Sequence, residues 1–276
     1  MKNESTARRL LRIPVLLLLL ITLVYISPFY ILTTISFKNP ADRSSYWHFP
    51  DVPTLENFKE AIAGAGIMGA LGRTAIITVC VVVLGVAISA LAAYPLARRE
   101  SRFNKGVQAF VLGIMMVPPL SILVSLYSII VGMGGINKLW AVILVIITYQ
   151  LPQGIFLYTN FIRSIPVALD EAATIDGCGP FKTFFLIILP QLKPVTASVA
   201  ILAGINCWND YQFTRYILQA SRMNTVTLSI SQFFSQTYSN LYAASAAALL
   251  AILPVIVCFI ILQKYFIQGM IDSAVK

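Results

Sequence analysis

The chain has 276 residues, of which 58% are hydrophobic and only 11% charged, and its mean hydropathy is +0.81. A soluble domain carries about a quarter of its residues as charged side chains, so this composition excludes an ordinary soluble fold and indicates an integral membrane protein. The net charge of +9 is dispersed over short loops without a basic stripe, so it does not indicate a nucleic-acid partner.

Six apolar stretches are long enough, or nearly long enough, to cross a bilayer, which takes about 20 helical residues. Their apolar residues are continuous rather than alternating, which favours helices over the strands of a barrel. The sequence therefore predicts an all-α membrane protein with six transmembrane helices, at residues 14–36, 70–94, 107–130, 139–158, 185–207 and 241–263.

The basic residues predict the orientation of these spans. Thirteen of the 20 Lys and Arg residues lie before the first span, after the second, around the segment 164–184 and after the sixth. Because cytoplasmic loops carry an excess of Lys and Arg, we expect the N and C termini and the segment 164–184 to be cytoplasmic.

The segment between the first two spans carries both signs of charge and several prolines, which is typical of an extracytoplasmic loop. Thr54 and Asn57 precede an apolar pattern and predict a short capped helix at the membrane interface. His48, the one histidine of the chain, is expected to be an interfacial side chain. We take residues 1–69 as the first transmembrane helix and this loop.

The second span, within residues 64–94, is rich in Gly, Ala and small polar residues, which allow close helix packing in lipid and predict a place inside the bundle. Arg73 near its start has two explanations. Its side chain could extend to the interface, or it could bond a carboxylate.

In the third span, Pro118 and Pro119 free backbone carbonyls that must be satisfied inside protein or water. We expect this helix to be kinked and buried in the bundle. The fourth span ends in a polar cytoplasmic half that includes Tyr149 and Gln150. These side chains are suited to a pore wall or to bonds between adjacent helices.

The segment 164–184 is the longest polar stretch in the second half of the chain. Pro166 suits the first turn of a helix, and the acidic residues Asp170 and Glu171 favour its positive end. Gly177 stands where a left-handed residue ends a helix, and Pro180 can open the next one. The prediction is a helix, a sharp turn and a second helix, in which small alanines would let another protein surface approach.

A spaced pattern in this segment carries a family resemblance. Glu-Ala-Ala, two residues, Asp-Gly and an aliphatic run ending in proline stand here as Glu171, Ala172, Ala173, Asp176, Gly177, Ile188 and Pro190. The pattern resembles the cytoplasmic loop signature of permease subunits of bacterial ATP-binding-cassette (ABC) importers. The resemblance implies a type I ABC importer permease fold, with a five-helix core at 70–264 and a coupling helix at 164–184 that sits in a cleft on the ATPase. The residues alone also allow an amphipathic helix lying on the membrane surface.

Three further stretches resemble the carbohydrate branch of that family, which includes the maltose-type permease. They are Pro-Thr-Leu-Glu-Asn at 53–57, Trp208-Asn209-Asp210, and the tail at 265–276. The resemblance implies a second permease subunit, expected to form a heterodimer with this one, an ABC ATPase dimer, an extracytoplasmic solute-binding protein and a sugar substrate. ATP and Mg would be bound by the ATPase, because this chain has no Gly-Lys-Ser/Thr phosphate loop; we expect no cofactor in the chain itself.

The candidate substrate path combines polar and aromatic side chains. Amides and a carboxylate offer paired donors and acceptors, and a tryptophan offers a flat apolar face, which together suit a sugar. The alternative is that the tryptophan is an anchor in the aromatic belt. The residues are Asn206, Trp208, Asn209 and Asp210 at the end of the fifth span, with Tyr149 and Gln150 of the fourth.

The tail at 265–276 is expected to be cytoplasmic. Gly269, Asp272 and Lys276 follow the sixth span in an arrangement that resembles tails entering the ATPase dimer interface. We predict that these residues contact the ATPase.

No catalytic or metal site is expected. The acidic residues lie in loops or at span ends, the single histidine has no Ser or Cys partner, and Cys80, Cys178, Cys207 and Cys258 form no close pair. The chain is therefore read as a transport subunit and not an enzyme, which moves a sugar across the bacterial cytoplasmic membrane by alternating access. The alternative is an ion-coupled secondary transporter or channel subunit, which would need an ionisable group near the bilayer midplane; the spans carry none there.

Overall fold

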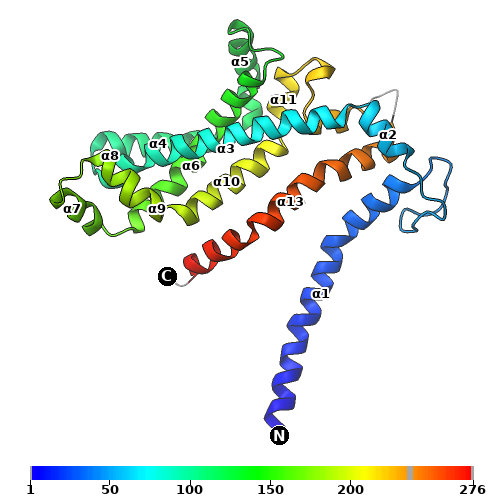
Figure 1. Ribbon diagram of the computed structural model, residues 1–276, viewed down its shortest axis with the longest axis horizontal. Coiled ribbons are helices and arrows are strands. Elements are labelled where there is room, and N and C mark those ends of the chain that lie inside the picture. The colour runs from blue at the N-terminus through cyan, green and yellow to red at the C-terminus, as the bar shows by residue number, and fades with distance from the viewer. Residues whose placement is uncertain (1, 235–238, 275–276) are drawn as a thin grey trace. The chain divides into compact units, whose positions relative to one another are not determined.

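The computed structural model describes residues 2–234 and 239–274; the side chains of 2–14, 262 and 264–274 lie outside this description. The described chain is almost entirely helical (Figure 1). It divides into two compact units, residues 1–67 with 230–254 and residues 68–229 with 255–276. The predicted all-α class is confirmed.

The first unit contains α1 (Lys2–Phe37), α2 (Glu56–Ala63) and the first part of α13 (Leu241–Ala274). Asn57 is only 2% exposed, and its Nδ2 donates to the carbonyl oxygens of Ser36 at 2.9 Å and Lys38 at 2.8 Å. These are carbonyls that the end of a helix leaves unpaired. The predicted short helix is confirmed, but Asn57 closes the end of α1 instead of capping its own helix.

The second unit carries most of the remaining elements. In chain order these are α3 (Ile67–Arg98), α4 (Arg102–Met115), α5 (Pro119–Gly132), α6 (Leu139–Ser164), α7 (Ala168–Ile175), α8 (Pro180–Thr183), the π-helical turn η1 (Phe184–Ile188), α9 (Leu189–Gln191), α10 (Lys193–Trp208), α11 (Gln212–Ile217), the 3₁₀ turn η2 (Ser221–Met223) and α12 (Val226–Ser231).

Among the described residues, four helical stretches are long and apolar enough to cross a membrane. They are Val15–Phe37, Ile67–Arg98, Leu139–Ser164 and Leu241–Ile261. Two further candidates are bent pairs, α4 with α5 at 101° and the stretch Pro180–Gln191 with α10 at 77°. The predicted number of six spans is reached when each bent pair counts as one span.

The bend between α4 and α5 falls at the double proline, as predicted. Pro118 has extended backbone angles, φ −63° and ψ 134°, and Pro119 opens α5. The expected burial is wrong, however, because Met116 is 84% exposed and Leu120 is 64% exposed. The two short helices diverge at 101° and pack mainly on different neighbours, α4 against α6 and α5 against α11.

One boundary differs from the predictions. The helix α6 continues to Ser164, so Tyr149 and Gln150 lie in its middle and not near its end. Beyond the fifth span, Phe213, Ile217 and Leu228 are buried with residues of α3, α5 and α6. Their apolar side chains make the short helices α11 and α12 part of the core.

A second core lies where α3, α6, η1 and α10 meet. It includes Ala90 and Ala93 of α3, Tyr158 and Ile162 of α6, and Phe184 of η1. A Cβ on Gly154 of α6 would collide with the side chain of Ser89 of α3. Small residues therefore bring these two helices together, as the composition of the second span predicted.

Arg73 bonds a backbone carbonyl where one of its two explanations predicted a carboxylate. Its Nε donates to the backbone carbonyl of Asn224 at 2.9 Å, and the neighbouring Thr74 hydroxyl accepts from the N–H of Val226 at 3.0 Å. Arg73 and Thr74 thus hold the segment between η2 and α12. The sequence could not predict this contact, because every residue has a backbone carbonyl.

Candidate functional site

The helix α7 spans two turns and begins at Ala168, two residues later than predicted. Pro166 lies in the turn before it, where its carbonyl accepts from the N–H of Leu169 at 3.3 Å. The acidic residues Asp170 and Glu171 lie in the first turn of α7, where the helix dipole favours negative charge. Figure 1 shows α7 and α8 together at one end of α3.

The end of α7 has the paired hydrogen bonds of a Schellman motif. The N–H of Cys178 donates to the carbonyl of Ala173 at 2.8 Å, and the N–H of Gly177 donates to that of Thr174 at 3.0 Å. Gly177 has φ +77°, the left-handed conformation predicted for it. Pro180 then opens α8, also as predicted.

The signature residues divide between an exposed and a buried face. Glu171, Ala172, Asp176 and Gly177 are exposed, and Ile175 is 87% exposed. Ala173 is 1% exposed, so the expectation that both alanines are open to another protein is wrong for Ala173. A two-turn helix that packs against its own chain must turn one face inward, and Ala173 lies on that face.

Of the two remaining signature residues, Ile188 is buried at the end of η1, and Pro190 is exposed and lies in α9. Leu192 follows it at the point where the chain turns by 77° into α10. The end of the signature thus coincides with a bend of the fifth span.

Asp170 joins α7 to the end of α3. The hydroxyl of Tyr94 donates to Asp170 Oδ1 at 2.7 Å, and Nη2 of Arg98 lies 2.8 Å from Asp170 Oδ2. The side chains of Arg98 and Asp170 are only 11% and 16% exposed. We call Tyr94, Arg98 and Asp170 the Asp170 clamp.

Further contacts extend the clamp to both neighbouring elements. Arg98 Nη1 donates to the carbonyl of Ile165, just before α7, at 2.9 Å. The ring of Tyr94 lies against Phe184 of η1, with 5.3 Å between the ring centroids. A movement of α7 would therefore act on α3 and on the bend before α10 through direct contacts.

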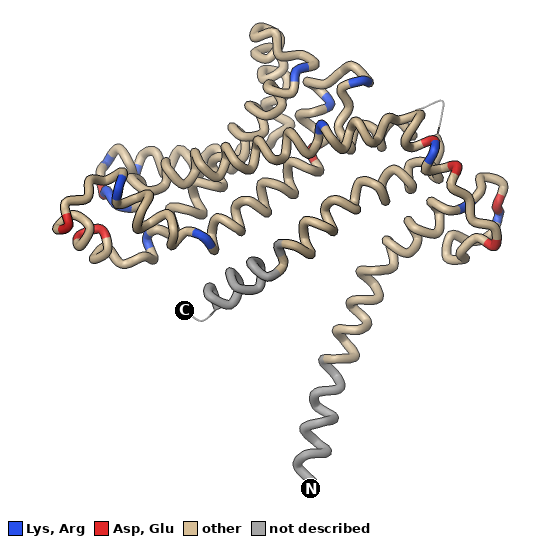
Figure 2. The backbone as a smooth tube through the Cα atoms, viewed as in Figure 1, with Lys and Arg blue, Asp and Glu red and all other residues tan. Residues whose placement is uncertain are grey.

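Sequence reasoning missed the clamp. From the sequence, Asp170 was expected to stabilise the positive end of its helix, and Arg98 was counted only among the basic residues that predict a cytoplasmic loop. No helical periodicity connects residues so far apart in the chain. The available signal was a basic residue, Arg98, at the end of one apolar helix and an acidic residue, Asp170, in the polar segment after another. Figure 2 shows that Lys, Arg, Asp and Glu gather around α7, α8 and the start of α4, while the long helices are free of them along most of their length.

Of the candidate substrate residues of the fifth span, two have side chains that are at least partly exposed, and two have side chains held by local hydrogen bonds. Asn206 is exposed and Trp208 partly exposed, whereas Asn209 Nδ2 donates to the Ile205 carbonyl at 2.9 Å. Asp210 Oδ1 accepts from the N–H of Thr214 at 2.9 Å. Burial raises the pKa of the Asp210 carboxyl, and that hydrogen bond opposes the rise. Asp210 thus holds the start of α11.

The two candidates of the fourth span lie in different surroundings. The ring of Tyr149 packs on Phe213 of α11, with 5.3 Å between centroids, which places it near the element that Asp210 holds. Gln150 instead lines a small hollow between α6 and α10 with Leu202. Its Oε1 is buried and has no hydrogen-bond partner within the described part of the chain. The structure therefore does not gather the six candidates into one pocket.

The tail is helical as far as it is described. The helix α13 continues to Ala274, so the backbone at Gly269 and Asp272 is helical, and their side chains are not described. Lys276 lies outside the described residues.

Comparison with known proteins identifies the family. Residues 85–272, more than half of the chain, match the model of the binding-protein-dependent transport system inner membrane component. The melibiose/raffinose/stachyose import permease of Bacillus subtilis is 43% identical over 267 residues, covering 96% of this chain and 97% of the relative. The trehalose/maltose transport permease of Thermococcus litoralis is 30% identical, covering 100% and 99%.

A solved structure shares the fold. A chain of a bacterial ABC transporter that imports the acidic polysaccharide alginate matches with a TM-score of 0.79 and 19% identity, covering 95% of this chain and 98% of that one. The family model and the two relatives, together with the apolar helices, agree with the signature found in the sequence. This chain therefore belongs to the family of binding-protein-dependent transport system inner membrane components and is a multi-pass membrane transport subunit.

Proposed function

We propose that this chain is the permease subunit of an ABC importer for sugars, working with a second permease subunit, an ATPase dimer and an extracytoplasmic solute-binding protein. The observation that carries the proposal is the 43% identity, over nearly the whole chain, to a permease whose name specifies melibiose, raffinose and stachyose import. We take oligosaccharides of that kind as the first candidate substrates.

The exposed face of α7 supports a docking role. Glu171, Ala172 and Ile175 lie on adjacent positions of a short helix and are exposed. A side chain as apolar as isoleucine, 87% exposed beside an acidic residue and outside the membrane spans, is typical of a surface that a partner protein covers. We infer that this face enters the ATPase cleft, with ATP and Mg held by the ATPase.

The Asp170 clamp supports a route from docking to transport. When the ATPase subunits close on ATP, α7 would move with them, and the clamp would carry this movement to α3 and α10. We propose that this exposes the sugar path alternately to the two sides of the membrane. For the path itself, the structure leaves Asn206 and Trp208 as the better candidates of the fifth span, because Asp210 and Asn209 are engaged in local hydrogen bonds.

Copurification tests the proposal. The full chain, tagged and expressed with its genomic neighbours, should retain an ATPase and a second permease, and cells should take up labelled raffinose or melibiose only when all subunits are present. Glu171→Lys should weaken ATPase retention through reversed charge, with Lys59→Gln, an exposed change in the other compact unit, as control. Isolation of a functional transporter without any ATPase would contradict the importer and favour the ion-coupled alternative.

Accessibility labelling tests the orientation. In a background without the four native cysteines, Val52→Cys, at a site 80% exposed, should react with a membrane-impermeant thiol reagent added to intact cells. Ile175→Cys, at a site 87% exposed, should react only after permeabilisation, since the basic residues place α7 in the cytoplasm. Labelling of Ile175→Cys in intact cells would overturn both the topology and the docking role of α7.

A further inference from the structure

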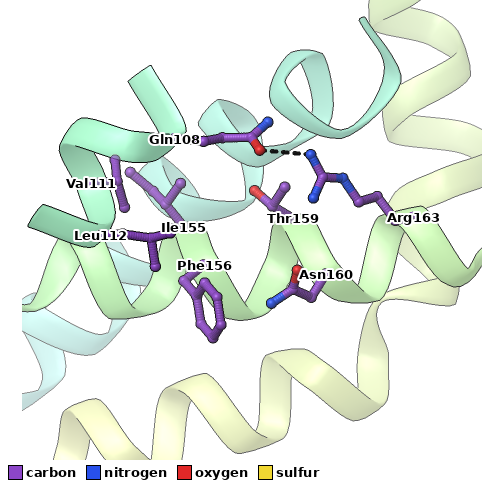
Figure 3. A pocket seen from close by; sticks show the side chains of 8 residues that line it. All are labelled: Gln108, Val111, Leu112, Ile155, Phe156, Thr159, Asn160 and Arg163. Carbon is purple, nitrogen blue, oxygen red and sulfur yellow. Dashed lines mark hydrogen bonds between the residues drawn. The ribbon is translucent and has the colours of Figure 1, made fainter. Parts of the chain in front are cut away.

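A hollow between α4 and α6 combines an apolar wall with a polar end. It encloses about 70 Å³ and is lined on its apolar side by residues that include Val111 of α4 and Phe156 of α6. Figure 3 shows its polar side chains, Gln108 from α4 and Thr159, Asn160 and Arg163 from α6. None of these takes part in the Asp170 clamp or in the candidate sugar path.

Gln108 holds Arg163 in place at this hollow. Its Nε2 donates to the carbonyl of Leu96 at 2.7 Å, and its Oε1 accepts from Arg163 Nη2 at 2.6 Å. The glutamine amide thus links α3, α4 and α6 and uses its oxygen to orient the guanidinium. The other nitrogens of Arg163 have no partner within the described chain and remain able to donate.

Thr159 supplies the observation that points to a ligand. It is 4% exposed, and its hydroxyl is buried without a hydrogen-bond partner among the described residues. A threonine in a helix can usually donate to the carbonyl four residues earlier, and this one does not. Figure 3 shows Thr159 between Gln108 and Arg163, on the side of the hollow. A buried hydroxyl without a partner is costly, so such a position favours a bound acceptor.

The donor groups that line the hollow indicate which charge a ligand there should carry. Thr159, the amide of Asn160 and Arg163 can all donate, and none of the described residues that line the hollow is a carboxylate. Lys105, one turn before Gln108 on α4, is paired with Glu100 at 3.8 Å, so the positive charge at the hollow comes from Arg163. The polar end therefore suits an anion, and the apolar wall suits a molecule with a hydrocarbon part.

The position in the membrane completes the argument. Arg163 stands in the last turn of α6, at the end of a membrane-spanning helix, where phospholipid headgroups lie. Basic pockets between helices at this level bind anionic headgroups. We propose that the hollow binds the phosphate of an anionic phospholipid, with the start of an acyl chain against Val111 and Phe156. The proposal rests on the membrane location and not on the identity of the transported sugar.

Native mass spectrometry of the full chain, purified in detergent and stripped of lipid, tests the site. When both lipids are then added in equal amounts, phosphatidylglycerol should bind in preference to phosphatidylcholine. Arg163→Gln should reduce its affinity about fivefold, as expected for one cation beside an anionic headgroup. Arg102→Gln, which removes an exposed cation of α4 outside the hollow, should have a smaller effect.

A second variant separates binding from folding. Thr159→Val removes a hydroxyl without a protein partner, so the thermal midpoint of the lipid-free chain should not fall, while phosphatidylglycerol retention should. Thr159→Ser should keep retention. Equal retention of the two lipids, equal losses in Arg163→Gln and Arg102→Gln, or displacement of the lipid by inorganic phosphate would each overturn the proposal; the last would indicate a site for free phosphate.

Discussion

Replacing Asp170 with asparagine is expected to reduce sugar uptake about tenfold or more while the ATPase remains bound to the permease. The carboxylate accepts the Tyr94 hydroxyl at 2.7 Å and pairs with Arg98 at 2.8 Å. Removing one charge of a buried pair leaves the other uncompensated, a loss of about 3 to 5 kcal/mol when the pair is fully buried, and tenfold needs only about 1.4 kcal/mol. The exposed face of α7 is unchanged, so docking should persist while α7 no longer moves α3.

Three measurements isolate this effect. ATPase copurification should be close to wild type in Asp170→Asn, uptake should fall, and the thermal midpoint of the purified permease should drop. Glu171→Gln is the matched control, since it removes the adjacent but exposed carboxylate and should leave the midpoint unchanged. A double-mutant cycle with Tyr94→Phe should give less than the sum of the two single effects. Normal uptake in Asp170→Asn would show that the clamp does not transmit movement.

Replacing Gly177 with valine should have the opposite pattern, with the ATPase released and the span helices intact. Gly177 has φ +77°, where a residue with a Cβ costs about 1 to 2 kcal/mol and a β-branched one more. A Cβ there would meet no heavy atom within 4 Å, so the cost comes from the backbone and not from a clash. The turn that ends α7 should open, and its docking face should lose its shape.

Two substitutions serve as controls for Gly177→Val. Gly177→Asn should retain most ATPase binding, because asparagine tolerates the left-handed conformation better than other residues. Gly179→Ala should be silent, since Gly179 has φ −76° and no atom near its Cβ position. Copurification of the ATPase with each variant, at matched membrane expression, decides the outcome. Equal retention of the ATPase in the valine and asparagine variants would show that docking does not depend on the left-handed turn at Gly177.

The features that sequence predicts well here depend on local chemistry. Gly177 was expected to be left-handed and Pro180 to open a helix because the conformational limits of these residues hold in any surroundings. The bend at Pro118 was expected because a proline there cannot complete the hydrogen bonds of one continuous helix. How far each helix continues was less predictable. The helix α6 extends to Ser164, and Tyr158 and Ile162 in its last turns are buried in the core that it shares with α3 and α10.

The sequence by itself determined the membrane class, the helical spans and the family signature, since these follow from residue composition and from spacing over one or two helical turns. Only the tertiary structure decided that Ala173 faces inward, that Arg73 bonds the carbonyl of Asn224, and that Asp170 meets Tyr94 and Arg98. The reason is that contacts between helices depend on how each helix is rotated and how far it extends. Neither is encoded in a local pattern, because apolar residues surround a membrane helix on most sides and leave no polar face to fix its rotation.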